Sequence, residues 1–109
     1  YKNISFLYKA DFRRILMTTR VAIISIIVEN DNATIKINEH LHKYKQYILG
    51  RLGLPYRERK ISVISIVLDA PEDKISALSG SLGCLDGVST KTVYSKKIFD
   101  NNENGETSE

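Results

Sequence analysis

The apolar residues of this 109-residue chain form two strand-like runs and stretches with helical spacing. The runs, residues 21–28 and 61–68, are short and rich in β-branched side chains, which is typical of strands. After the first run, the side chains of residues 30–32 offer oxygens that can cap a helix. The apolar residues that follow recur at steps of three and four and predict an amphipathic helix: Ala33, Ile37, Leu41, Tyr44 and Ile48.

Glycine and proline mark the ends of the predicted elements. Gly50 and Gly53 are predicted to end the first helix, and residues 52–57, which include a proline, can form only a short or edge strand. Pro71 suits the first position of a second helix, and Gly83 suits its end. The apolar stripe of this second helix consists of Ile75, Leu78 and Leu82.

Residues 88–94 alternate in polarity and predict a last strand. The order is then strand, helix, short strand, long strand, helix, strand, which is the split pattern of the ferredoxin-like βαββαβ fold. The predicted fold class is α+β, a two-layer sandwich with an antiparallel sheet and two helices on one face. A competing three-strand arrangement differs only in whether residues 52–57 pair.

The two long strands are apolar on both faces, although helices in such a fold cover only one. In the first strand, residues 22, 24, 26 and 28 share one face, and the other carries Val21, Ile23 and Ile27. Apolar side chains on the second face need cover, and we expect a homo-oligomer, a dimer or tetramer, to provide it through these three residues. The N-terminal extension and the edge of a larger assembly are the alternative covers.

Residues 17–97 are predicted to form the folded domain. Residues 100–109 have no large apolar side chain and carry four carboxylates, so residues 98–109 are expected to be a disordered acidic tail. Residues 1–16 are expected to be an extension, either a genuine appendage or sequence upstream of a natural start at Met17.

Length and composition exclude several classes of protein. One core is all that this length allows, which excludes a multidomain enzyme. The longest apolar stretch is far shorter than the roughly 20 residues of a membrane helix, so no membrane partner is expected. The single cysteine, Cys84, excludes an intrachain disulfide and suits a reducing, cytoplasmic location.

No residue constellation supports catalysis or a cofactor. His40 and His42 are two apart on the predicted helix, so their side chains diverge and cannot hold one ion together. Nothing in the sequence brings Cys84 to a histidine as a nucleophilic pair. We therefore predict no metal site, no cofactor and no enzymatic activity.

Nucleic acid and small anions are the remaining ligands that the net charge of +3 suggests. RNA-recognition modules of this topology stack bases on aromatic residues of the central strands, and residues 21–28 and 61–68 contain none, which argues against direct nucleic-acid binding. For a small anion, the candidates are Asn30 and Asn32 at the helix start and Arg57 and Arg59 in a basic loop. A solvated loop and a plain helix cap, with Asp31 occupying the same donors, are the competing interpretations.

Five stretches resemble the iron-only hydrogenase system regulators. They are RVAIISIIVEN (20–30), KINE (36–39), GLPYRE (53–58), ISALSGSLG (75–83) and GVSTKTV (87–93), and the resemblance extends over about residues 17–97. This family is similar in fold to ACT domains and to the C-terminal domain of nickel-responsive repressors. The resemblance implies a ferredoxin-like, oligomeric regulatory module.

The sequence departs from both of these related groups. The nickel-sensing histidines and cysteine are missing from residues 61–68 and 71–73, and Ala33 stands near the position of the glycine that ACT domains use at their ligand turn. We therefore predict a non-enzymatic, self-associating ACT-like regulatory domain of the iron-only hydrogenase system, which senses a small ligand at a subunit interface or acts through a protein partner. The alternatives are a small ferredoxin-like enzyme with an unidentified site and a nucleic-acid-binding module.

Overall fold

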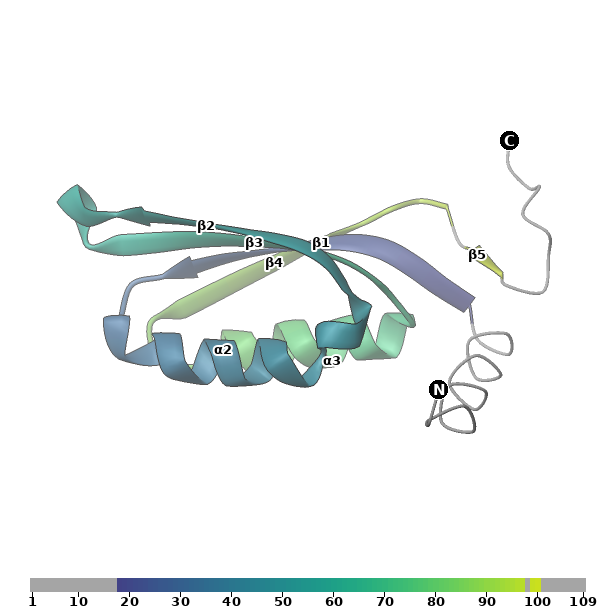
Figure 1. Cartoon of the computed structure of the whole chain (residues 1–109), viewed down its shortest axis with the longest axis horizontal. Helices are drawn as coiled ribbons and strands as arrows, with labels where there is room; N and C mark the ends of the chain where they lie inside the picture. Colours follow the sequence, from purple (N-terminus) through teal and green to yellow (C-terminus); the bar gives the residue numbers. More distant parts are fainter. Residues whose placement is uncertain (1–17, 98, 101–109) are drawn as a thin grey trace, which may run out of the picture.

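Four antiparallel strands and two α-helices form two layers in the computed structural model, which describes residues 18–97 and 99–100 (Figure 1). The strand order is β2-β3-β1-β4, and both helices cover the same face of the sheet. The fold is therefore the ferredoxin-like sandwich that the sequence predicts. The elements are β1 (Thr18–Val28), α2 (Thr34–Lys43), β2 (Ile48–Tyr56), β3 (Ile61–Ala70), α3 (Glu72–Gly83) and β4 (Val88–Tyr94), with single 3-10 turns η1 (Asp31–Ala33), η2 (Lys45–Tyr47) and η3 (Arg57–Arg59).

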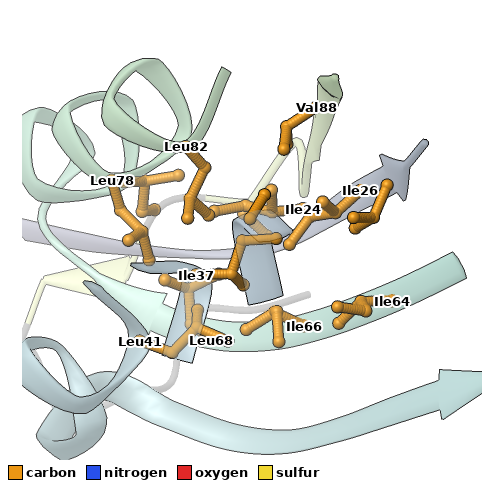
Figure 2. Close-up of a cluster of buried hydrophobic side chains, with 14 of the residues drawn as sticks. Ile24, Ile26, Ile37, Leu41, Ile64, Ile66, Leu68, Leu78, Leu82 and Val88 are labelled. Carbon is orange, nitrogen blue, oxygen red and sulfur yellow. The ribbon is translucent and has the colours of Figure 1, made fainter. Parts of the chain in front are cut away.

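The core lies between the sheet and the helices, and it uses one alternate set of strand residues. Figure 2 shows Leu78 and Leu82 of α3 and Ile37 of α2 reaching toward Ile24 of β1 and Ile66 of β3. The predicted stripe of α3 is confirmed, because Ile75, Leu78 and Leu82 are all fully buried. Burial of this continuous apolar layer is the main favourable term for folding.

The apolar spacing predicts that the first helix continues to Ile48, and this prediction was wrong. The α-helix ends at Lys43, since Tyr44 leaves helical geometry, and Ile48 begins β2. Gly50 and Gly53 therefore lie within a strand and do not end a helix. Residues 52–57 do pair with the neighbouring strand up to Tyr56, which decides for the four-strand arrangement.

A second correction concerns the expected tail. Phe99–Asp100 form a short strand, β5, which pairs with Thr18 and Thr19 at the start of β1. The rest of the predicted tail and the predicted extension, residues 1–16, lie outside the described residues.

Replacing a core isoleucine should cost far more stability than replacing an exposed one. Ile24 is fully buried and Ile35 is 70% exposed. We expect Ile24→Ala to lower the free energy of unfolding by about 2–5 kcal/mol, and the matched control Ile35→Ala to change it by less than about 0.5 kcal/mol. Urea unfolding at one protein concentration measures both values, and equal losses would contradict the described core.

Candidate interaction face of the sheet

The face of the sheet that points away from the helices carries two apolar rows. Strand register places Leu54, Val63 and Ile27 side by side across β2, β3 and β1. A second row joins Val67, Ile23 and Val93 across β3, β1 and β4. Between the rows lie Leu52, Ser65, Ser25 and Lys91. We call this surface the open face.

The predicted interface residues lie on this open face and are accessible there. Ile23 is 39% exposed and Ile27 is 41% exposed, whereas the alternating residues of β1 are buried against the helices. Val21 shares their face and is half-buried. The two-sided apolar pattern of β1 is thus confirmed, and it leaves large apolar side chains exposed.

Strand β2 extends the open face, although none of its residues was predicted to belong to the interface. Leu52, Leu54 and Tyr56 pair with open-face residues of β3 and are all exposed. Their alternation in the sequence was a usable signal, but the glycines and the proline of this segment favoured only a short or edge strand whose pairing stayed open. Among the described residues, only Ile35 and Leu49 are large exposed hydrophobics that do not belong to this face.

The end of the β2–β3 hairpin is basic. Arg57, Glu58 and Arg59 form η3, and Lys60 closes the turn in the left-handed conformation with φ 59°. All four side chains are exposed. Figure 1 shows this tip at the far end of the hairpin, on the side of the molecule away from the helices. We call residues 57–60 the basic tip.

The turn after β1 is held by its own hydrogen bonds. The Asn32 N–H donates to Oδ1 of Asn30 at 3.0 Å, and Nδ2 of Asn30 donates to Oδ2 of Asp86 at 3.2 Å. The Glu29 N–H also donates to the Gly87 carbonyl at 2.7 Å. Asn30, and not Asp31, is therefore the side chain that caps this turn.

The two halves of the predicted anion site lie at the same end of the sheet. Val28 pairs with Ser62, which places the turn at Asn30 and Asn32 near the same end as the basic tip. Among the described residues, no hydrogen bond or ion pair joins that turn to Arg57 or Arg59. Within the described residues of one chain, direct polar contacts therefore do not hold the four residues together.

Arg20 ties the opposite end of the sheet together, a role that the sequence did not suggest. Its Nη2 donates to the Ser95 carbonyl at 2.7 Å, and its Nη1 lies 3.4 Å from Glu72 Oε1. The guanidinium also lies over the ring of Tyr94, 4.7 Å from the ring centroid, which is a cation–π contact. These contacts connect β1, the start of α3 and the end of β4, so their role is structural.

Metal-ligand candidates stay apart in the fold. His40 is half-buried and His42 exposed on α2, while Cys84 is an exposed thiol after α3. Within residues 18–97 and 99–100, no three His, Cys, Asp or Glu side chains are grouped as a metal site. The same part of the chain contains no helix with the length and hydrophobicity to cross a membrane.

These features define a class: a small ferredoxin-like domain whose sheet has one face covered by helices and one apolar face open. The family model described as "TM1266-like: Iron-only hydrogenase system regulator, putative" matches residues 20–92, from β1 into β4. The chain belongs to this family, as its five sequence stretches indicated.

A solved structure supports the same assignment. The uncharacterized protein TM1266 from Thermotoga maritima is 42% identical to this chain, with a TM-score of 0.69, and the match covers 72% of this chain and 99% of that one. A search of curated proteins found no match.

The separation of His40, His42 and Cys84 predicts that the protein does not hold a transition metal. We expect neither nickel nor zinc to co-purify stoichiometrically or to raise the melting temperature, because no preformed ligand set binds the folded state. Elemental analysis and thermal unfolding with each ion measure this. Stoichiometric binding that disappears in Cys84→Ala would contradict it.

Proposed function

We propose that this chain is a non-enzymatic regulatory domain that acts as a homo-oligomer, with the open face as the interface between subunits. The observation that carries the proposal is the pair of apolar rows on a face that the helices do not cover. The family description, which names a regulator of the iron-only hydrogenase system, supports the regulatory role.

The composition of the open face favours a protein partner over water. Its two central strands carry one charged residue on this face, Asp69, which lies at the end of β3 beside Val21. Full burial of a Val, Leu or Ile side chain contributes about 1.5–3 kcal/mol, and Leu54 is still 61% exposed. Several such side chains buried together can offset the loss of freedom that association costs, which is about 4–15 kcal/mol.

A second copy is the partner that this face fits best. The open face is continuous over four strands, and both of its rows are aliphatic, so one row can pack on a row of another copy in an isologous pair. Sheets that pack face to face bury such rows at a separation of about 10 Å. A dimer or a tetramer built from such pairs satisfies this geometry.

Ligand sensing is the finer part of the proposal. Arg57 and Arg59 are exposed cations, and guanidinium groups bind carboxylate and phosphate well. Asn30 and Asn32 lie in a turn at the same end of the sheet. A small anion that bridges the turn and the arginines needs both, and no hydrogen bond or ion pair joins them within the described residues of one chain, so we place this ligand where two subunits meet.

Charges placed on the open face should dissociate the oligomer. We expect Ile23→Asp combined with Ile27→Asp to reduce the apparent mass to that of one chain, because two carboxylates would be buried without partners. Size-exclusion chromatography with light scattering measures the mass, and circular dichroism checks that the variant is folded.

The matched control for this experiment is Ile35→Asp, which adds a carboxylate at an exposed isoleucine of α2 on the other layer. It should keep the mass of the unaltered protein. If the double variant stays folded and oligomeric, the open face is not the interface.

The basic tip should determine binding of a small anion. We expect phosphate or citrate to raise the melting temperature of the unaltered protein, and Arg57→Ala with Arg59→Ala to abolish the increase while self-association survives. Lys96→Ala with Lys97→Ala removes two exposed charges elsewhere and serves as the control. An unaltered protein that neither anion stabilises would contradict the ligand proposal.

A further inference from the structure

An acidic corner lies at the same end of the sheet as the basic tip. Glu29 follows β1, Asp31 begins η1, and Asp86 precedes β4, and all three side chains are exposed. The Glu29–Gly87 and Asn30–Asp86 hydrogen bonds hold these residues together beside the ends of β1 and β4. The basic tip lies at the same end but beside the other two strands, β2 and β3.

We infer that two copies pair across their open faces about a two-fold axis parallel to the strands, so that the basic tip of each copy lies on the acidic corner of the other. This inference rests on the self-association proposed above, and it fixes the orientation of the two subunits. The site formed at each corner contains Asn30 and Asn32 from one subunit and Arg57 and Arg59 from the other.

The position of the axis follows from the strand order. An axis parallel to the strands, between β3 and β1, places β2 of one copy over β4 of its partner and keeps the two like ends of the sheets together. The tip lies after β2 and before β3. It is then placed over the partner's corner, which lies after β1 and before β4. Its position on the side away from its own helices places it toward that partner (Figure 1).

Charge favours this orientation over a pair whose two-fold axis crosses the strands. The tip carries Arg57, Arg59 and Lys60 against Glu58, while the corner carries three carboxylates. Opposite charges on the facing surfaces favour the correct encounter and orientation of two proteins, although charges at the rim of an interface contribute little affinity. The apolar rows would therefore supply the affinity, and the two ends would select the orientation.

Lys91 supports the same choice. It is an exposed charge on β4, in the row of residues that lies between the two apolar rows of the open face. A two-fold axis that crosses the strands along this row would place Lys91 against its own copy in the partner, which places like charges together. An axis parallel to the strands instead places it opposite Leu52 of the partner subunit, at the edge of the interface, where its long stem can cover apolar surface.

Cysteine cross-linking between two differently substituted chains tests the orientation. In a Cys84→Ser background, one chain carries Arg59→Cys on the basic tip and the other carries Asp31→Cys at the acidic corner. Both positions are exposed, so the fold should be unaffected, and circular dichroism checks this. After co-expression and treatment with a short bis-maleimide, about half of the pairs should be cross-linked, since random pairing makes about half of them mixed.

A second mixture separates the possible outcomes. Asp73→Cys places the thiol in the first turn of α3, at the other end of the sheet. Cross-linking of Arg59→Cys to Asp73→Cys in place of Asp31→Cys, or an oligomer in which neither mixture is cross-linked, would overturn the orientation and leave self-association standing. Absence of cross-linking together with the mass of a single chain would overturn the proposed function itself.

Discussion

The β1–β3 pair is apolar on both of its faces, and the rest of the molecule depends on how these faces are covered. On one face, Ile24 and Ile66 are fully buried beneath the two helices. On the other, Ile23 and Val63 remain 39% and 37% exposed. Because the central strands gain stability from burial on both sides, a single subunit satisfies only half of their pattern. The proposed assembly follows from this fold because a second subunit would bury the exposed apolar side chains of the second face.

Polar side chains at the two ends of the sheet position the connections between its elements. Arg20 holds the end of β4 and the start of α3 at one end, while Asn30 and Asp86 join two connections at the other. Gly87 permits the latter contact, since its φ is +75° and an added Cβ would lie 2.6 Å from Cβ of Asn30. The acidic corner is thus held by its own hydrogen bonds, whereas the basic tip projects from a two-stranded hairpin.

Most of the fold could be predicted from periodicity, because the buried elements carry strong patterns. The β1 and β3 runs and the stripe of α3 are each determined by their own residues and agree with the structure. The boundary between α2 and β2 could not be predicted, since Tyr44 and Ile48 continue the helical spacing while the pairing of β2 with β3, with its irregularity between Ile48 and Gly50, is a tertiary effect. The periodicity that identified β1 also placed three of its residues on the second face: Val21, Ile23 and Ile27. The register of β2 against β3 was needed to place three further residues on the open face: Leu52, Leu54 and Tyr56.

Sedimentation equilibrium of the unaltered protein, over a dilution series in the micromolar range, shows whether a second copy covers the open face. We expect a mass that is a multiple of the 12.4 kDa chain and that falls toward a single chain only on strong dilution. A 12.4 kDa species at every concentration would contradict it, because the open face would then remain exposed to water in the native protein.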